Sequence, residues 1–245
     1  MIFVRSALFM AWFLIVTIIM SIIFLPLLAC PRKWCVWMAR LWAKATLWGL
    51  KIFAGTGMRV IGSPPKGAVL VASKHMSMWD TLALYLLLDD PGIVLKRELL
   101  RIPFYGWYLW KNCAIAIDRG AGADAMRRMI HASTKVLNEG RPILIFPEGT
   151  RRKSGAPTDY KAGVVGLYAL LKKPCVPVAL DSGLYWQGFF KYPGDITVQF
   201  LEAVPPGLKR NAFMPLLQER IEAATEALLA LKRRRFTSQT HHRPL

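Results

Sequence analysis

The sequence predicts an α/β domain with a mainly parallel central sheet flanked by helices, preceded by a motif of two membrane-associated helices. Short apolar runs of strand length recur through the middle of the chain. Segments with helical periodicity separate most of these runs, and such alternation is typical of α/β layer architectures. The first 56 residues are strongly apolar and contain six basic residues but no acidic residue. The length of 245 residues suits one domain of ordinary size with appended helices.

Residues 6–30 form the first predicted element, a membrane-embedded helix. The segment has no formal charge, and about 20 apolar residues suffice to cross a bilayer. It is longer than the apolar core of a signal peptide, and no small-residue cleavage pattern follows it, so we expect it to be retained. Basic residues are denser after the segment than before it, which predicts that the bulk of the chain faces the cytoplasm. Whether the helix spans the bilayer or turns back at Pro26 stays open.

Residues 31–53 have the periodicity of a second helix that combines a basic face with several tryptophans. Indole rings settle at the depth of lipid headgroups, where cationic side chains meet lipid phosphates, so we expect this helix to lie at the membrane interface. The alternative is a helix packed on the globular domain with a solvated charged face. The basic residues on one face are Lys33, Arg40, Lys44 and Lys51, and the tryptophans are Trp34, Trp37, Trp42 and Trp48.

The globular part begins after a glycine- and proline-rich joint at residues 55–67, which surrounds a short strand at 58–61. Further strands are predicted at 68–72, 92–95, 113–117, 142–146, 175–180 and 196–200. Helices are predicted at 81–88, 123–138, 163–171 and 215–231, the last followed by a basic cluster at 232–235 and a polar tail. We therefore divide the chain into membrane helices (1–56), a catalytic domain (57–210) and a C-terminal helix with a basic tail (211–245).

The charge balance narrows the classes of partner. Lys and Arg outnumber Asp and Glu by 33 to 15, and such a surface attracts anionic lipid, nucleic acid or acidic carrier proteins. Because the basic residues of the first 56 positions coincide with the most apolar stretch, a membrane surface is favoured over nucleic acid, for which no module signature is present. The four cysteines have no metal-ligand spacing, so we expect reduced thiols and no metal site.

His75 and Asp80 lie between a predicted strand and a predicted helix, where catalytic groups are often held. Across such a turn the carboxylate of Asp80 can reach the imidazole Nδ1 and fix its tautomer, which leaves Nε2 free as a general base. By itself, a surface histidine followed by a helix-capping aspartate would have the same spacing.

A second group of polar residues follows the predicted strand at 142–146. The loop directly after this strand contains Glu148, Gly149, Thr150 and Arg151. The guanidinium of Arg151 is planar and presents several N–H donors in an arrangement that suits a phosphate. A solvated Glu-Arg pair in a turn is the structural alternative, but the position directly after a strand favours a binding site.

Together these segments resemble the glycerolipid acyltransferase superfamily, and most closely the bacterial 1-acylglycerol-3-phosphate O-acyltransferases. Several ordered blocks between about residues 57 and 205 carry the resemblance, which is more specific than any one block. The blocks are His75 with Ser77 and Asp80; Lys96, Glu98, Leu99, Pro103 and Gly106; Ala116, Ile117, Asp118 and Arg119; the intact Phe-Pro-Glu-Gly-Thr-Arg at 146–151; and Val176, Pro177 and Val178.

The resemblance implies the reaction and the residues that perform it. His75, held by Asp80, would take the proton from the sn-2 hydroxyl of lysophosphatidate as that oxygen attacks an acyl thioester, making phosphatidate for phospholipid biosynthesis. No acyl-enzyme, metal or cofactor is implied. The donor would be acyl carrier protein or coenzyme A, and the site would face the cytoplasm at a bacterial inner membrane. The acceptor's phosphate would be received by Arg151, Lys96 and Arg119, the pocket shaped by Glu148, Gly149 and Thr150, and the acyl channel lined or supported by Val176, Pro177 and Val178.

One residue departs from the family pattern, because many members have Asn where this chain has Lys74 before the histidine. The extra cation puts the acceptor subclass in question, so another lysophospholipid, glycerol 3-phosphate or an amino-acid lysolipid stays an alternative acceptor. A non-catalytic basic membrane adaptor is an alternative of another class. A serine hydrolase is disfavoured because the chain has no G-x-S-x-G motif. The glycines near residue 120 imitate a dinucleotide-binding loop, but no acidic residue follows at the end of a second strand.

Overall fold

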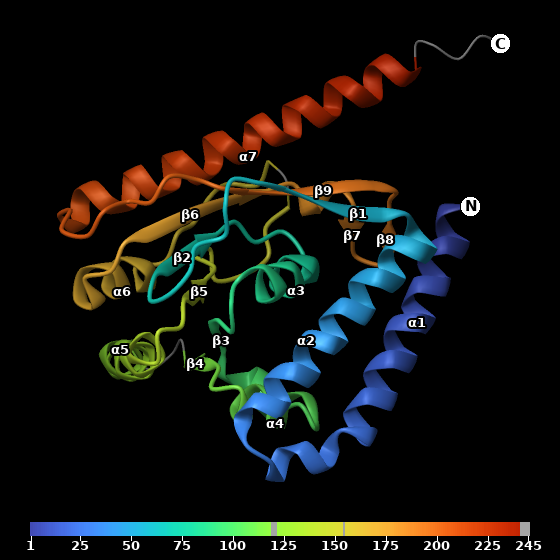
Figure 1. Cartoon of the computed structure of the whole chain (residues 1–245). Coiled ribbons are helices and arrows are strands. Elements are labelled where there is room, and N and C mark those ends of the chain that lie inside the picture. The colour runs from blue at the N-terminus through green and yellow to red at the C-terminus, as the bar shows by residue number, and fades with distance from the viewer. Residues whose placement is uncertain (119–121, 154, 241–245) are drawn as a thin grey trace.

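The computed structural model describes residues 1–118, 122–153 and 155–240. In this part of the chain a seven-stranded sheet has the strand order β1-β9-β6-β2-β5-β3-β4 (Figure 1). Only the β6–β9 pair is antiparallel, so the five strands from β6 to β4 run in one direction. The strands are β1 (Thr56–Ile61), β2 (Leu70–Ser73), β3 (Gly92–Lys96), β4 (Ile115–Ile117), β5 (Ile143–Ile145), β6 (Cys175–Leu180) and β9 (Gly194–Phe200).

The predicted α/β fold with a mainly parallel sheet is confirmed. Each predicted strand is present, and its ends lie within two residues of the predicted ends. Two short elements were not predicted, because neither contains enough residues to establish a period. They are α4 (Tyr105–Lys111) and a hairpin formed by β7 (Trp186–Gln187) and β8 (Phe190–Lys191).

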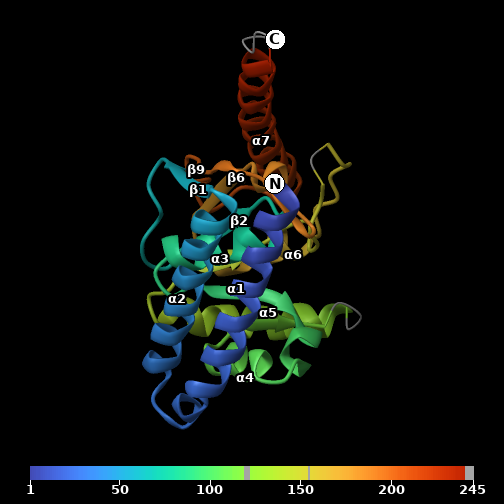
Figure 2. The ribbon, with the colours of Figure 1, turned by 90° about the vertical axis from the view of Figure 1, so that its right-hand side faces the viewer.

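Side chains that alternate along the strands build two hydrophobic clusters, one on each face of the sheet. In β2, Leu70 and Ala72 pack with α5 (Gly122–Asn138), α6 (Gly163–Leu171) and α7 (Arg210–Thr240). Val71, between them, faces the opposite cluster, which contains α3 (Met78–Leu87) and residues of the N-terminal helices. The molecule therefore has three layers, with α7 and the N-terminal helices on opposite faces of the sheet (Figures 1 and 2).

The N-terminal segment is a helical hairpin. Helix α1 (Ile2–Ile23) is the only described helix that is long and apolar enough to cross a membrane. A 3-10 turn (Leu25–Ala29) then reverses the chain into α2 (Arg32–Gly49), which lies alongside α1 (Figure 2). The prediction of one helix to residue 30 was wrong at its end. Pro26 has no amide hydrogen and its ring obstructs the preceding turn of an α-helix, so the helix stops before it.

Helix α2 combines both interpretations considered for it. Its tryptophans Trp34, Trp37 and Trp48 are exposed, as an interfacial helix requires. Arg40, expected to face lipid phosphates, instead donates to the carbonyl oxygens of Leu86 and Leu88 at the end of α3. Cationic side chains are favourable near helix C-termini, where carbonyl groups lack partners. The helix is thus anchored to the domain on one side and open on the other.

Helix α7 is longer than predicted at both ends. It begins at Arg210, five residues before the predicted start, and continues to Thr240 through the basic cluster that we expected to begin a tail. Pro215 lies in its second turn. The prediction that this helix ends near residue 231 was therefore wrong.

Candidate active site

The loop between β2 and α3 contains His75, and a capping box starts the helix that follows. Ser77 is the N-cap of α3, and Asp80, in the first turn, accepts the backbone N–H of Ser77 in return. Paired bonds of this kind satisfy amide groups that have no partner inside the helix. The predicted start of this helix, at residue 81, was late because the Ser-x-x-Asp cap was not identified.

Asp80 is fully buried and holds His75 in a defined tautomer. Its Oδ2 lies 3.0 Å from Nδ1 of His75 and also accepts the backbone N–H groups of Met76 and Ser77 at 2.7 and 2.8 Å. Oδ1 accepts the hydroxyl of Ser77 at 3.1 Å. An ionised carboxylate can only accept, so Nδ1 of the imidazole carries a proton. Nε2 makes no hydrogen bond with the residues that the structure describes and is available as a base.

The segment after β5 lies directly against this loop, as the ordered sequence blocks predicted. The ring of Phe146 stacks on the imidazole of His75 with 3.9 Å between centroids. Glu148, also buried, accepts the backbone N–H of His75 at 3.2 Å, and the N–H of Arg152 donates to the carbonyl oxygen of His75 at 2.8 Å. His75 is therefore fixed by its ring, its amide and its carbonyl, with its side chain 12% exposed.

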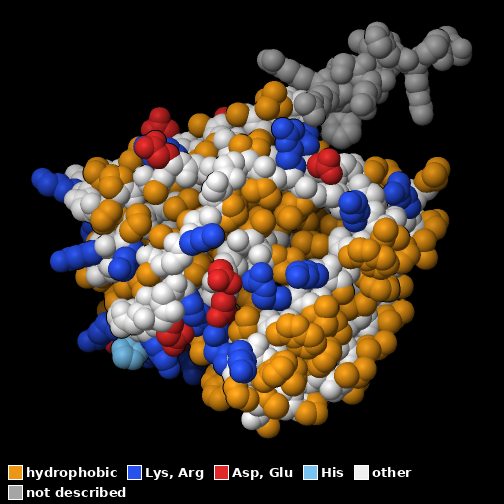
Figure 3. All heavy atoms as spheres, in the orientation of Figure 1, with side chains coloured by type: hydrophobic (Ala, Val, Ile, Leu, Met, Phe, Trp, Pro, Cys, Tyr) orange, Lys and Arg blue, Asp and Glu red, His pale blue; other side chains and the backbone are white. Residues whose placement is uncertain are grey.

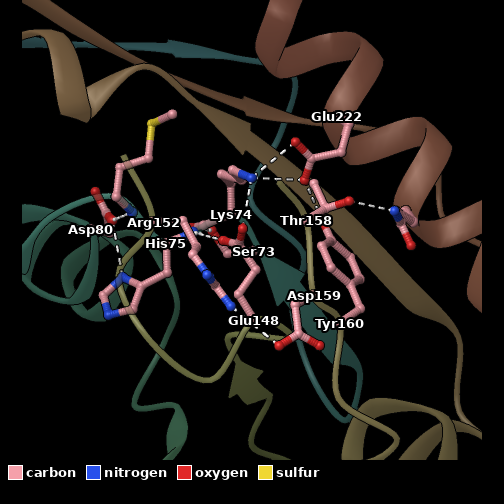
Figure 4. Close-up of polar contacts among 12 residues, drawn as sticks. Ser73, Lys74, His75, Asp80, Glu148, Arg152, Thr158, Asp159, Tyr160 and Glu222 are labelled. Atoms are coloured by element: carbon pink, nitrogen blue, oxygen red, sulfur yellow. Dashed lines mark hydrogen bonds and ion pairs between the residues drawn. The ribbon is translucent and has the colours of Figure 1, made fainter. Parts of the chain in front are cut away.

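Lys74 is almost fully buried, at 3% exposure, and is paired with carboxylates on the other side of the loop. Its ammonium lies 2.8 Å from Oε1 of Glu148 and 2.8 and 2.9 Å from the two oxygens of Glu222 in α7. Tyr160 donates to Glu222 at 2.9 Å, and burial together with this negative neighbour raises the pKa of the phenol. In Figure 4 the imidazole of His75 and the ammonium of Lys74 point to different sides of the loop.

Two of the predicted phosphate ligands, Lys96 and Arg151, lie at the same edge of the sheet. Lys96 ends β3 and Arg151 follows β5, and these parallel strands, with β2, present their carboxyl ends together. Both side chains are exposed, and neither makes a hydrogen bond or ion pair within the described ranges. Arg119, the third predicted ligand, lies outside the described residues. Thr150 is exposed, and Gly149 has a positive φ of 65°, which suits the turn that directs the loop toward His75.

The segment formed by Val176, Pro177 and Val178 is part of strand β6, in the centre of the sheet and buried. It runs beside β2, and the carbonyl oxygen of Val178 accepts the backbone N–H of Lys74 at 3.0 Å. These contacts support the loop that carries His75. The lining of an acyl channel by these residues stays a prediction.

Sequence reasoning missed several residues that hold the loop. Ser182 lies 3.0 Å from the capping hydroxyl of Ser77. Glu222 contacts Lys74 from a distant part of the chain and accepts the hydroxyl of Tyr160. The unusual lysine before the histidine was a signal, because a buried ammonium requires carboxylate partners. A groove of about 840 Å³ lies along α7 beside this loop, and its lining residues include Lys74, Met76, Thr158, Gln218 and Glu222.

The chain is similar to known acyltransferases in sequence. The acyltransferase family model matches residues 57–181. The chain is 36% identical over 161 residues to the 1-acyl-sn-glycerol-3-phosphate acyltransferase of Pseudomonas aeruginosa, covering 64% of this chain and 63% of that protein. It is 29% identical over 182 residues to human 1-acyl-sn-glycerol-3-phosphate acyltransferase alpha, covering 70% and 63%. The chain thus spans less than two thirds of the length of these curated relatives.

The fold has a solved counterpart. The crystal structure of the 1-acyl-sn-glycerophosphate acyltransferase PlsC from Thermotoga maritima is similar, with a TM-score of 0.76 over 94% of this chain and 98% of that chain, at 20% sequence identity. The likeness extends over 94% of this chain, whereas the family model begins after the N-terminal hairpin and ends before α7. The match over half the chain confirms the resemblance inferred from the ordered blocks: the chain belongs to the acyltransferase family.

Proposed function

We propose that this chain transfers an acyl group from a thioester to the sn-2 hydroxyl of lysophosphatidate. The observation that carries the proposal is the His75–Asp80 pair, with Nδ1 bonded to a buried carboxylate and Nε2 unbonded within the described chain. Family membership and the names of the relatives support this acceptor.

The proposed chemistry is a direct transfer. Nε2 of His75 takes the hydroxyl proton as the acceptor oxygen attacks the thioester carbonyl, which forms a new C–O bond. The tetrahedral intermediate then collapses, the C–S bond breaks, and the leaving thiolate takes the proton from the imidazolium. Asp80 stabilises the positive imidazolium formed between these steps. A general base contributes about 10²- to 10⁴-fold, so the positioning of both substrates supplies much of the remaining acceleration.

We assign the acceptor's phosphate to Arg151 and Lys96, with Arg119 as a third candidate. The first two are exposed cations at the carboxyl edge of the sheet and have no partner within the described ranges. A guanidinium can bind a phosphate through two parallel hydrogen bonds, and the ammonium adds a point charge. Glu148 is proposed to shape the pocket through its buried carboxylate, which is bonded to Lys74 and to the amide of His75.

The membrane supplies the acceptor. The surface of α1 is largely exposed and apolar, and hydrophobic side chains gather over the N-terminal helices in Figure 3. Helix α2 packs on both α1 and α3, so α1 is held against the domain. We therefore infer that α1 lies within one leaflet and does not span the bilayer as an isolated helix. The domain would face the cytoplasm at a bacterial inner membrane. The net charge of +18 favours encounter with an acidic acyl carrier protein or with coenzyme A as donor.

An acceptor panel tests this function. The purified full chain in lipid micelles is given acyl-coenzyme A or acyl carrier protein, with lysophosphatidate, glycerol 3-phosphate, lysophosphatidylglycerol or monoacylglycerol. We expect turnover of lysophosphatidate, and Arg151→Ala should raise its KM with a much smaller effect on monoacylglycerol. Good turnover of another acceptor without turnover of lysophosphatidate would refute the assigned substrate. Absence of transfer with every pair would favour a non-catalytic membrane adaptor.

A further inference from the structure

The β7–β8 hairpin lies beside the N-terminal end of α1, outside the active site (Figure 1). The two strands pair Trp186 with Lys191, and residues 188 and 189 form the turn. The hairpin is fixed to α1 because the backbone N–H of Lys191 donates to the hydroxyl of Ser6 at 2.9 Å. In addition, the ring of Trp186 packs edge-on against Phe9, with 5.4 Å between centroids.

Lys191 is 1% exposed, although it makes no ion pair within the described ranges. Its ammonium donates to the carbonyl oxygens of Gly188 and Phe189 at 2.6 and 2.9 Å, and it lies 4.4 Å from the ring centroid of Trp186. Burial lowers the pKa of this lysine to about 8. Carbonyl and cation–π contacts replace part of the lost hydration of the ammonium. The carbonyl groups of the turn are thereby satisfied from inside the protein.

The outer surface of the same turn is aromatic. Phe189 and Phe190 are 41% and 42% exposed, and Phe3 at the start of α1 is 63% exposed. Phe189 contacts both of the other rings, each with 5.5 Å between centroids. The three rings are continuous with the exposed apolar side of α1, where Val4 and Leu8 also lie exposed. Contiguous apolar patches of this kind mark protein or membrane contacts.

We propose that the tip of the β7–β8 hairpin enters the same leaflet as α1 and forms a separate lipid contact. Irregular backbone can enter hydrocarbon only when its polar groups have internal partners, and the ammonium of Lys191 satisfies both turn carbonyls. Continuity with α1 identifies the occupant as lipid. The inference rests on the proposed membrane association of α1. It adds a second contact, which holds the N-terminal end of α1 at the depth of the hairpin.

The experiment measures the depth of a spin label in the full chain, reconstituted in vesicles of phosphatidylethanolamine and phosphatidylglycerol. Cys30 and Cys113, the partly exposed cysteines, are first replaced by Ser, whereas Cys35 and Cys175 are buried and stay. A label is then introduced by Phe190→Cys. Leu14→Cys on α1 is the membrane reference, and Leu170→Cys, at an exposed position of α6 on the opposite layer, is the aqueous reference.

We expect the label at residue 190 to resemble that at residue 14. Its collision rate with a polar nickel chelate should be about tenfold lower than at residue 170, because the chelate is excluded from hydrocarbon. The proposal would be overturned if the label at residue 190 were as accessible to the nickel chelate as the label at residue 170. If the label at residue 14 is also aqueous, the membrane association of α1 itself is wrong.

A second variant tests the ammonium. Lys191→Met places an apolar side chain of similar length beside the rings of Phe9 and Trp186. The substitution leaves the carbonyl oxygens of Gly188 and Phe189 without the ammonium donor. We expect the label at residue 190 to become about as accessible to the nickel chelate as the aqueous reference, since carbonyls without partners are costly in hydrocarbon. An unchanged depth would contradict the role of Lys191.

Discussion

Asp80 connects the start of a helix to the chemistry of the site. Its carboxylate accepts bonds from the imidazole of His75, from the amides of Met76 and Ser77, and from the hydroxyl of Ser77. Four donors around one buried carboxylate fix its orientation. The same contacts that begin α3 therefore set the tautomer of the proposed base.

Replacing this carboxylate by an amide tests the dual role. In Asp80→Asn one oxygen becomes an NH₂ group that faces donors, so we expect acyl transfer to fall by about 10²-fold or more. We also expect a loss of about 1–3 kcal/mol in the free energy of unfolding from unsatisfied amides. Transfer rates and chemical unfolding in micelles measure both. Asp124→Asn, at an exposed position of α5, is the control, and equal behaviour of the two variants would contradict the account.

Asp181, in the segment after β6, is buried and has one oxygen without a partner among the described residues. Burial raises its pKa to about 6, although it accepts the N–H of Thr197. Because the folded state holds this proton more tightly than the unfolded state, its contribution to stability is present below about pH 4 and is lost as the pH rises to about 6.

Asp181→Asn should remove this dependence. We expect the variant's unfolding free energy to change less than that of the wild type between pH 4 and 6, by up to about 3 kcal/mol. Denaturant unfolding at several pH values measures the difference. The same slope in both proteins would show that Asp181 has an ordinary pKa.

Sequence spacing was enough to bring His75 and Asp80 together, because five residues across a capped turn define a local geometry. It also identified Lys74 as unusual. It could not identify the partners of Lys74, because Glu222 lies 148 residues away and reaches the loop only through the packing of α7 on the sheet. Tertiary contacts of this kind have no local pattern.

At the scale of elements, α7 is part of the site although it lies beyond the segment that the family model matches. Its Glu222 and the buried Glu148 share the ammonium of Lys74, and Glu148 also holds the amide of His75. We infer that α7 positions the loop through this chain of contacts. The lysine replaces the Asn of many members, and its buried ammonium is shared between the carboxylates of Glu148 and Glu222.

A double-mutant comparison tests this coupling. Glu222→Gln should lower kcat about tenfold with little change in KM, because the buried ammonium loses a charged partner. Lys74→Asn should do the same, since two carboxylates then face each other without a cation. The double variant Lys74→Asn with Glu222→Gln should recover much of the lost rate. Independent, multiplying effects would contradict the coupling, and Glu226→Gln on the same helix is the control.

Regular elements were predicted well where a period could be counted. Helix 163–171 and strand 175–180 agree at both ends with α6 and β6, because clear turn residues border them. The N-terminal helix and α7 were misjudged, since proline ended the first helix and tertiary packing extended the last. The β7–β8 hairpin, with two residues in each strand, is too short for a periodic signal.

At the scale of the molecule, the N-terminal hairpin and α7 occupy opposite faces, and the proposed base lies at the edge between them. The hairpin is attached by charge as well as by packing. Arg32 of α2 lies 2.6 Å from Asp90, which also pairs with Arg141 at 3.0 Å. These groups are only partly exposed, so screening by solvent is reduced. Apolar composition predicted a membrane motif, but not this attachment.

Asp90→Asn tests the attachment. The backbone of Asp90 has a positive φ of 50°, which Asn tolerates, so the substitution removes mainly the charge. We expect a loss of about 1–3 kcal/mol in stability and faster proteolysis in the 25–35 region, measured in micelles. Asp89→Asn, at the exposed neighbouring position, should change neither quantity. Equal stability of both variants would contradict an electrostatic anchor.

The central claim, that the imidazole of His75 removes the acceptor's proton, is tested most directly by single-turnover acyl transfer to lysophosphatidate with His75→Ala. The account predicts a rate at least about 10²-fold below that of the wild type, with the unfolding midpoint nearly unchanged, because Asp80 keeps its bonds to the capping amides. A folded variant that transfers the acyl group within a few-fold of the wild-type rate would contradict it.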